Sequence, residues 1–413
     1  MVVSSDGLRG GGFSARIPLM RPLLILFILV TPLVAQEPRV QISHTTESLR
    51  GVSAVLRKIA WASGTHGTYL RTLDGGITWT PAQVPGAESL DFRGVVAFSA
   101  AQAFLMSAGP GEQSRIYHTS DGGQHWDLQF TNTNPKGFFD SIAFWDAHHG
   151  VVVGDPIPDE TGKLKFEVLV TDDGKTWKPV PPSQLPQAKE GEGAFAASNS
   201  CIAILPNARW QMTPGAMPGS SDSNNTSQID PNIWFATGGK VARVFHSGDQ
   251  GETWQVFDTP ILQGRDSTGI FSIAFRDTLN GVIAGGDYKH PDDDGPNLAF
   301  TYDGGKTWDL SRIHPQAFFS AIAYDQNVNL EAGHEHTAEL TKEKNGKRQR
   351  IEPVPPQRLF VVGDDFIFDF RPPANPRRIS PNKKLGIKFN AASPYAEGGA
   401  IVVGPKGTIV TIP

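Results

Sequence analysis

Short runs of β-forming residues alternate along this chain with polar turns that contain glycine. Runs such as "FEVLVT" and "WQVFDT" are rich in β-branched and aromatic residues, which favour strands. No segment shows the sustained apolar period of 3.6 residues that an amphipathic helix needs. With 44 glycines and 32 prolines among 413 residues, the composition suits many short strands joined by tight turns. The pattern predicts an all-β fold.

One eight-residue turn occurs five times, as "TLDGGITW", "TSDGGQHW", "VTDDGKTW", "SGDQGETW" and "TYDGGKTW". Each copy lies between two strand-like runs and is typical of a hairpin, in which the carboxylate accepts hydrogen bonds from turn amides. Glycine supplies a positive φ, and the tryptophan would bury its ring against the neighbouring repeat. In the third copy, Val170 stands where the others have a hydroxyl. Five copies favour a structural role for the aspartates, which are Asp74, Asp121, Asp172, Asp249 and Asp303.

The spacing of these hairpins predicts a β-propeller. Their tryptophans lie 47, 51, 77 and 54 residues apart, and such a strand period is typical of one four-stranded blade. A strand–turn–strand pattern that ends in glycine precedes each hairpin and recurs twice more, which gives seven units. The fourth unit begins with "FAASNSCIAI" at residues 195–204. The last unit lacks a fourth strand, which residues 39–46 would supply, closing the ring and removing open sheet edges.

Two insertions, at residues 205–231 and 330–357, fall between the first and second strands of their blades. In an antiparallel meander, the first–second and third–fourth turns lie on one side, which we call the hairpin face. The second–third turns and the links between blades lie on the other side, which we call the link face. We therefore expect the Asp hairpins and both insertions on the hairpin face.

Residues 1–35 are predicted to be an export signal and residues 38–413 the propeller. Residues 22–35, "PLLILFILVTPLVA", form an uncharged apolar run that follows two arginines. The run is short for a membrane span and fits a signal-peptide core with cleavage after Ala35, although translation could begin at Met20. We expect a periplasmic or secreted monomer with no membrane span in its mature form.

The hairpins and the run "LRGVSAV…IAWASGTHGTYLRTLDGGITW" resemble the photosystem II stability/assembly factor-like propellers. These Asp-box (BNR repeat) proteins are related in fold to sialidases and sortilin-type receptors. The resemblance covers residues 40–413 and implies a propeller whose relatives in the assembly-factor branch are non-catalytic lumenal or periplasmic scaffolds. Because Asp boxes occur in enzymes, receptors and scaffolds alike, the resemblance defines the fold more than the activity. The leading interpretation is an exported binding or assembly scaffold with a protein partner or a carbohydrate-like ligand.

Candidate binding residues gather on the predicted link face, where loops of propellers converge on the central channel. They are Arg50, Arg93, Asp140, Asp155, Glu192, Asp287, Tyr288 and Lys289. Such charges could simply cap turns and pair around a solvated channel, or they could form a binding site. Carboxylates near arginines also leave open an exported glycosidase-like (sialidase-type) hydrolase, which needs two carboxyls at a defined separation.

Other chemistry has weak support in the sequence. A net charge of -5 without a basic stripe argues against nucleic acid, and no glycine-rich loop opens a helix as a dinucleotide site would require. The "HEH" of residues 334–336 lacks a third ligand, and the "PDDDG" of residues 291–295 lacks EF-hand spacing. We predict no cofactor and no metal. The single cysteine, Cys201, excludes an intrachain disulfide and is expected in the core.

Overall fold

The computed structural model describes residues 1, 38–205, 230–312, 316–325, 341–344, 347–350, 358–370, 377–378 and 388–413. Residues 36–413 form one compact unit that carries every described strand. Among the described residues there is one short 3-10 helix, η1 (Gly111–Gln113), and no described helix is long and apolar enough to cross a membrane. The fold is all-β, as predicted. The predicted export signal lies, apart from Met1, outside the described residues.

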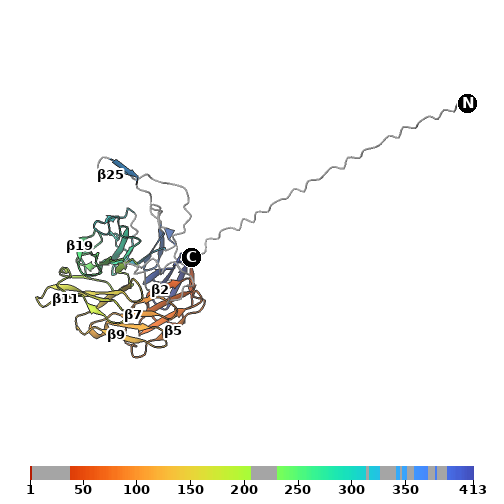
Figure 1. Cartoon of the computed structure of the whole chain (residues 1–413), viewed down its shortest axis with the longest axis horizontal. Helices are drawn as coiled ribbons and strands as arrows, with labels where there is room; N and C mark the ends of the chain where they lie inside the picture. Colours follow the sequence, from red (N-terminus) through yellow and green to blue (C-terminus); the bar gives the residue numbers. More distant parts are fainter. Residues whose placement is uncertain are drawn as a thin grey trace. The chain divides into compact units, whose positions relative to one another are not determined.

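The strands form seven four-stranded antiparallel blades, and their colours follow the sequence around the unit in Figure 1. Blade 1 contains β2 (Leu49–Leu56), β3 (Ile59–Gly64), β4 (Thr68–Thr72) and β5 (Thr80–Gln83). Blade 2 contains β6 (Phe92–Ala97), β7 (Ala103–Ser107), β8 (Arg115–Thr119) and β9 (Asp127–Thr131). Blade 3 contains β10 (Phe139–Phe144), β11 (Gly150–Pro158), β12 (Leu164–Thr171) and β13 (Lys178–Pro179).

Blade 4 contains β15 (Ile202–Ile204), β16 (Ile233–Ala236), β18 (Arg243–Ser247) and β19 (Gln255–Asp258). Blade 5 contains β20 (Thr268–Phe275), β21 (Gly281–Asp287), β22 (Leu298–Thr301) and β23 (Asp309–Leu310). Blade 6 contains β24 (Phe319–Tyr324), β27 (Leu359–Gly363), β28 (Ile367–Phe370) and β29 (Arg377–Arg378). Blade 7 contains β30 (Ala391–Pro394), β31 (Ala400–Gly404), β32 (Thr408–Ile412) and β1 (Arg39–Gln41).

Two short strand pairs lie outside this pattern. β14 (Glu192–Gly193) pairs with β17 (Gly238–Gly239), which in turn pairs with β20 and so extends the sheet of blade 5. β25 (Thr341–Lys344) and β26 (Lys347–Arg350) form a hairpin within the insertion between β24 and β27. The other insertion lies between β15 and β16, and residues 206–229 of it are outside the described residues.

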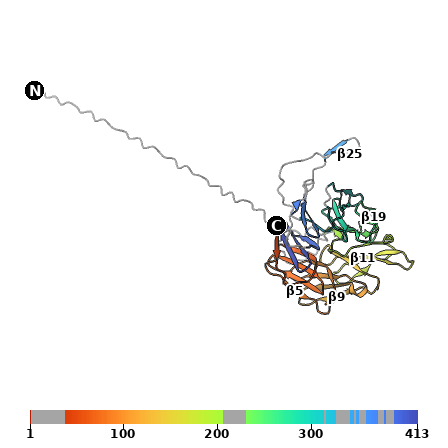
Figure 2. The same ribbon diagram turned by 180° about the vertical axis from the view of Figure 1, so that it is seen from behind.

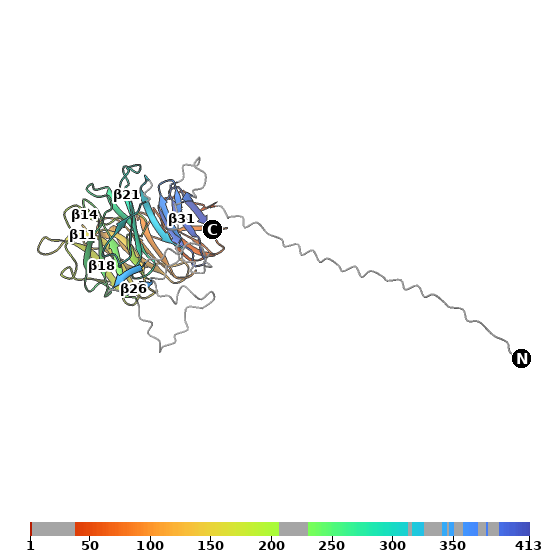
Figure 3. The same cartoon turned by 90° about the horizontal axis from the view of Figure 1, so that it is seen from above.

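The ring is closed by the N-terminal strand, as predicted. β1 pairs antiparallel with β32, with Arg39 opposite Thr411 and Gln41 opposite Ile409. The reverse view and the view from above both show the C-terminal strands beside the first blades (Figures 2 and 3). Gln41 also joins blade 7 to blade 1, because its Oε1 accepts a hydrogen bond from Trp79 Nε1 at 2.7 Å. No described blade of the ring is left without a fourth strand.

Seven apolar clusters hold the blades together, and each is built from two neighbouring blades. One joins blades 1 and 2 around Trp61 and Phe92, and another joins blades 7 and 1 around Leu49 and Val403. The remaining five join each next pair around the ring. Burial of apolar surface between blades is the dominant stabilising contribution in such a fold. The fold is a seven-bladed β-propeller.

The first strand of blade 4 is shorter than the sequence predicted. Strand pairing covers only Ile202–Ile204, whereas residues 194–200 leave the strand path; we call them the channel segment. Asn199 adopts a φ of 61°, which is incompatible with a strand, and its side chain bonds to the backbone of Ile142 in blade 3. Alanine, serine and asparagine also have a low preference for strands. Contacts of their side chains with other blades therefore determine the conformation of the channel segment.

Candidate functional site

The aspartates of the hairpins use their oxygens within the turn. In the last copy, Asp303 Oδ1 accepts the N–H of Thr307 at 3.0 Å, and Oδ2 accepts the Thr307 hydroxyl at 2.7 Å. The Thr301 hydroxyl donates to Asp303 Oδ1 at 2.9 Å. Matching contacts surround Asp74, Asp121 and Asp249. This geometry supports a structural role for these carboxylates.

The third hairpin corrects the sequence-based assignment of Asp172. Its turn is one residue shorter, so Asp173 accepts the N–H of Thr176 at 2.7 Å and the hydroxyl of Thr171 at 3.1 Å. Asp172 instead points outward and pairs with Lys178 at 3.2 Å. The hydroxyl therefore is not missing from this copy. Counting back from the tryptophan selected the wrong aspartate. In this copy, as in the others, one residue separates the hydroxyl residue from the aspartate, here Thr171 and Asp173.

On the link face, Arg50 and Arg93 meet at Asp91. Arg50 Nε lies 3.4 Å from Asp91 Oδ1, and Arg93 Nε lies 2.9 Å from Asp91 Oδ2. The side chains of the two arginines are each 30% exposed, and that of the aspartate is 22% exposed. Arg50 lies on β2 and Arg93 on β6, the innermost strands of neighbouring blades, and Asp91 lies in the link before β6. Two guanidinium groups share one carboxylate, so the cluster carries a net positive charge that is open to solvent.

Asp140 and Asp155 lie beside Arg93 but are turned inward. Asp155 Oδ1 accepts the N–H of Ala194 at 3.0 Å, and Asp140 accepts the N–H of Ala196. Asp140 is 1% exposed, and no hydrogen-bond partner of its Oδ2 is present among the described residues. Burial raises the pKa of Asp155 to about 6 and, together with the charge of Asp155, raises the pKa of Asp140 well above its ordinary value. Asp140 is buried and Asp155 is partly buried, and both contact the channel segment.

Glu192 belongs to a separate buried ion pair. Its Oε1 accepts Arg243 Nε at 2.9 Å and the Thr237 hydroxyl at 2.8 Å. Its Oε2 accepts the N–H of Lys189 at 2.8 Å and contacts Arg243 Nη2 at 2.5 Å. Every oxygen of this carboxylate is therefore engaged by the protein, in the region where β14 meets β17. The arrangement suits a structural anchor of the link between blades 3 and 4 better than a ligand contact.

Asp287 fixes the turn that carries Tyr288 and Lys289. Its side chain is fully buried, pairs with Arg265 at 3.3 Å, and accepts the N–H of Lys289 at 2.9 Å. Despite burial, hydrogen bonds from His290 and its neighbours lower the pKa of Asp287 to about 2, so it is ionised at neutral pH. The turn is thus held rigidly by a charged group that is not itself available to a ligand.

An aromatic cluster supports Tyr288 from below. The ring of Tyr288 is 48% exposed, with its centroid 6.4 Å from Phe195 and 6.0 Å from Phe271 in edge-on contacts. Phe195 and Phe271 stack at 3.9 Å. Through Phe195 and Ala196, the channel segment connects this cluster to Arg93. The sequence did not predict this aromatic support, and the only signal for it was the phenylalanine at the start of "FAASN".

The acidic turn of residues 291–295 is engaged by an arginine. Within the described part of the chain, ligand atoms of Asp287, His290 and Asp293 lie within 4.8 Å of one another. Arg265 pairs with Asp293 at 2.7 Å and with Asp287 at 3.3 Å, so one guanidinium already engages both carboxylates. This arrangement gives a metal site no support. The "HEH" of residues 334–336 lies outside the described residues.

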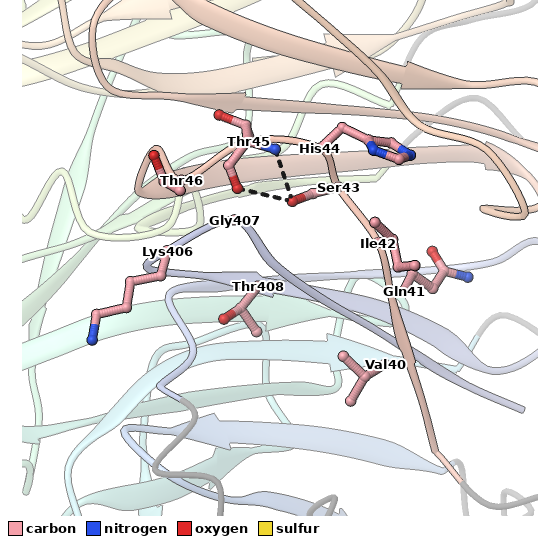
Figure 4. A pocket seen from close by; sticks show the side chains of 10 residues that line it. All are labelled: Val40, Gln41, Ile42, Ser43, His44, Thr45, Thr46, Lys406, Gly407 and Thr408. Atoms are coloured by element: carbon pink, nitrogen blue, oxygen red, sulfur yellow. Dashed lines mark hydrogen bonds between the residues drawn. The ribbon is translucent and has the colours of Figure 1, made fainter.

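A shallow depression lies beside the closing strand, where the link from β1 to β2 meets the turn between β31 and β32. It has a volume of about 830 Å³ and is lined by residues 40–46 and 406–408. Figure 4 shows its lining side chains, which are mostly polar; the Ser43 hydroxyl donates to the carbonyl of Thr45 and accepts the Thr45 N–H. None of the candidate residues predicted from the sequence lines it.

The fold places the chain in the class of seven-bladed β-propellers. No family model matches the chain. It is 24% identical over 302 residues to the photosystem II assembly protein Ycf48 of Synechococcus sp. (strain JA-2-3B'a(2-13)), covering 58% of this chain and 87% of that protein. It is also 34% identical over 67 residues to the chloroplastic photosystem II stability/assembly factor HCF136 of Arabidopsis thaliana, covering 16% of each.

A solved structure described as YCF48 bound to D1 peptide has the same fold, with a TM-score of 0.56 and 14% identity over 91% of this chain and 97% of that one. The chain is therefore a homologue of the photosystem II assembly factors Ycf48 and HCF136, which confirms the resemblance seen in the Asp hairpins.

Proposed function

We propose that this protein is an exported, non-catalytic propeller that binds an extended segment of a partner protein on its link face, as an assembly scaffold. The observation that carries the proposal is that the side chains of Arg50 and Arg93 are each 30% exposed there and Tyr288 is 48% exposed, whereas Asp287, which fixes the turn of Tyr288, is fully buried. Arginine and tyrosine are the residue types that dominate binding energy at protein interfaces.

The chemistry of this face fits an acidic segment with an apolar or aromatic side chain. Arg50 and Arg93 share one carboxylate, so a second carboxylate from the partner would complete their charge balance. Tyr288 offers a rigid ring, because Asp287 fixes its turn and Phe271 supports it. The D1 peptide bound by the structural relative supports a protein partner for this chain.

The hydrolase alternative has less support. It relied on convergence near Arg50 and Arg93 of four carboxylates, Asp140, Asp155, Glu192 and Asp287. Asp140 is buried, both oxygens of Glu192 are engaged by Arg243 and its neighbours, and Asp155 and Asp287 accept backbone N–H groups. A glycosidase needs one carboxyl to protonate the leaving group and a second to act on the sugar, both exposed to the substrate. A carbohydrate ligand without turnover remains an outcome of the test below.

Export and a monomeric state complete the proposal. The apolar run of residues 22–35 supports targeting to the periplasm or the medium. N-terminal sequencing of the protein from its host should find the mature chain beginning after Ala35, and full-length protein in the cytosol would contradict export. Sedimentation of the purified protein should give the mass of one chain.

The proposed function is tested by affinity capture from the native envelope, beside a panel of chromogenic glycosides. We expect a stoichiometric protein partner that is lost on Arg50→Glu or Arg93→Glu and kept on Lys58→Glu. Lys58 is an exposed cation in the turn between β2 and β3, on the hairpin face, so it matches the charge change at another site. Thermal unfolding checks that each variant is folded. Turnover of a glycoside that Asp155→Asn abolishes in folded protein would defeat the scaffold proposal.

A further inference from the structure

The channel segment, residues 194–200, is bound on one side by blades 2 and 3. Arg93 of blade 2 donates from Nη1 to the carbonyl of Ala196 at 3.0 Å. In blade 3, the N–H of Ile142 donates to Asn199 Oδ1 at 2.8 Å, and Asn199 Nδ2 donates back to the carbonyl of Ile142 at 3.1 Å. These contacts join residues about 60 to 100 positions apart in the chain, so the segment is placed by tertiary contacts and not by a local turn.

On the other side, the same segment is bound by blades 5 and 6. Phe195 stacks on Phe271 of blade 5, and the Ser198 hydroxyl donates to the carbonyl of Ser320 in blade 6 at 2.8 Å. Blades 2 and 6 are as far apart as a ring of seven allows. A segment that contacts both must cross the centre of the ring, and residues 194–200 therefore lie across it.

Two carboxyls contact this segment, of which Asp140 is buried and Asp155 is partly buried. Asp155 accepts the N–H of Ala194 and Asp140 accepts the N–H of Ala196, so alternate amides of the segment end on blade 3. The approach is close, since a Cβ on Gly193 would lie 2.8 Å from Asp155 Oδ1. The interaction of both carboxyls with the segment depends on their protonation, because Asp140 is buried, Asp155 is partly buried, and the charge of Asp155 acts on Asp140.

Few charges near the pair can compensate for its ionisation. The ionisable groups on the surrounding elements are Arg93 on β6, Lys165 and Glu167 on β12, Cys201 before β15, and the mutually neutralising Glu192 and Arg243. Arg93 favours the charged form of Asp140, whereas Glu167 opposes it. Lys165 is held away by the carbonyl of Leu185, and burial raises the pKa of the Cys201 thiol, which stays neutral. Ionisation of both aspartates therefore leaves excess negative charge.

We propose that residues 194–200 form a proton-dependent closure of the channel, which is seated while Asp140 and Asp155 are protonated and is released as they ionise. A seated segment desolvates both carboxyls, and a released one returns them to water. The seated state therefore binds protons more tightly, and raising the pH shifts the equilibrium toward release.

This regulation rests on the proposed function, because the closure shapes the binding face. Ala196 holds Arg93 and Phe195 supports Tyr288, so release of the segment removes one partner of each. The binding face is assembled when the carboxyls are protonated and is loosened at higher pH. Binding should therefore be tighter at acidic than at alkaline pH.

The closure is tested without any partner by hydrogen exchange of the purified full-length protein at pH 5 and pH 8, corrected for intrinsic exchange rates. If Asp155 titrates near 3.8 when released and near 6 when seated, the opening equilibrium increases about tenfold between these pH values, and Asp140 adds to it. We expect protection of the amides of residues 194–198 to fall by at least that factor, while β3 keeps its protection. In Asp155→Asn, which retains an oxygen acceptor for Ala194, most of the change should disappear.

The matched control is Asp172→Asn, which removes an exposed carboxylate of the same blade and should leave the pH dependence intact. Equal protection of residues 194–198 at both pH values would overturn the proposal. So would an undiminished pH dependence in both Asp155→Asn and Asp140→Asn, or a parallel loss of protection in β3, which would indicate unfolding of the whole domain. Because no ligand is involved, failure to find a partner leaves this result unaffected.

Discussion

Replacement of Asp303 by alanine should destabilise the propeller without changing what it binds. Four hydrogen bonds end on this carboxylate: the N–H groups of Lys306 and Thr307, at 3.1 and 3.0 Å, and the hydroxyls of Thr301 and Thr307, at 2.9 and 2.7 Å. A hydrogen bond to a charged group contributes roughly 1.5–3 kcal/mol, but water can replace the partners of the exposed Lys306 and Thr307. We therefore expect a loss of about 1–3 kcal/mol in the free energy of unfolding.

Urea denaturation at pH 7 measures this loss as a lower midpoint at an unchanged slope. Asp303→Asn keeps an oxygen for the two N–H groups, so its midpoint should fall between those of wild type and Asp303→Ala. The bond from the N–H of Gly305 to the Thr301 hydroxyl remains in both variants. A change below about 0.5 kcal/mol in Asp303→Ala, the usual range for surface substitutions, would refute the structural role. Loss of partner binding in a variant of normal stability would refute it as well.

Three further changes probe other sites. Asp173→Ala should lower the urea midpoint while Asp172→Ala leaves it unchanged, and the reverse order would restore the assignment made from sequence spacing. Glu192→Ala leaves Arg243 buried without its partner and should cost about 3–5 kcal/mol in chemical denaturation; a near-neutral result would show that Glu192 is not an anchor. Asp155→Asn should raise the free energy of unfolding by up to about 3 kcal/mol at pH 8 but not at pH 3. Folding raises the pKa of Asp155 from 3.8 to about 6, so the carboxyl favours the folded state only while it is protonated. The wild-type protein therefore loses stability as the pH rises through this range. A wild-type urea midpoint that stays constant from pH 4 to pH 7 would contradict this last expectation.

The architecture could be predicted because it depends on local signals that repeat. Each Asp hairpin brings its own turn residues, and the glycine of each copy, such as Gly76 and Gly305, adopts the positive φ that the turn needs. Closure by residues 39–41 could be predicted because an incomplete last blade leaves an unpaired edge that another strand must cover. The hairpin turns and the closure of the ring could be predicted from the repeated pattern and the number of strands, without knowledge of contacts between residues far apart in the chain.

The details of the binding face depend on contacts that sequence spacing does not show. Asp140, Glu192 and Arg50 look alike in the sequence, as charges near strand ends. In the structure Asp140 is buried under the channel segment, Glu192 is paired with Arg243, and the Arg50 side chain is 30% exposed. Which of these a residue becomes is decided by the path of residues 194–200. That path follows from side-chain bonds to other blades, as with Asn199 and Ile142, and local propensity gives no indication of them.

The face that binds the partner is the central claim, and photo-crosslinking tests it most directly. Tyr288 on the link face and Tyr302 on the hairpin face are both exposed, by 48% and 65%, so each can be replaced by a photoreactive phenylalanine analogue as a matched pair. After irradiation in the native envelope, the variant labelled at position 288 should form a covalent adduct with the captured partner, and the variant labelled at position 302 should not. Adducts from position 302 alone would place the partner on the hairpin face and contradict the account.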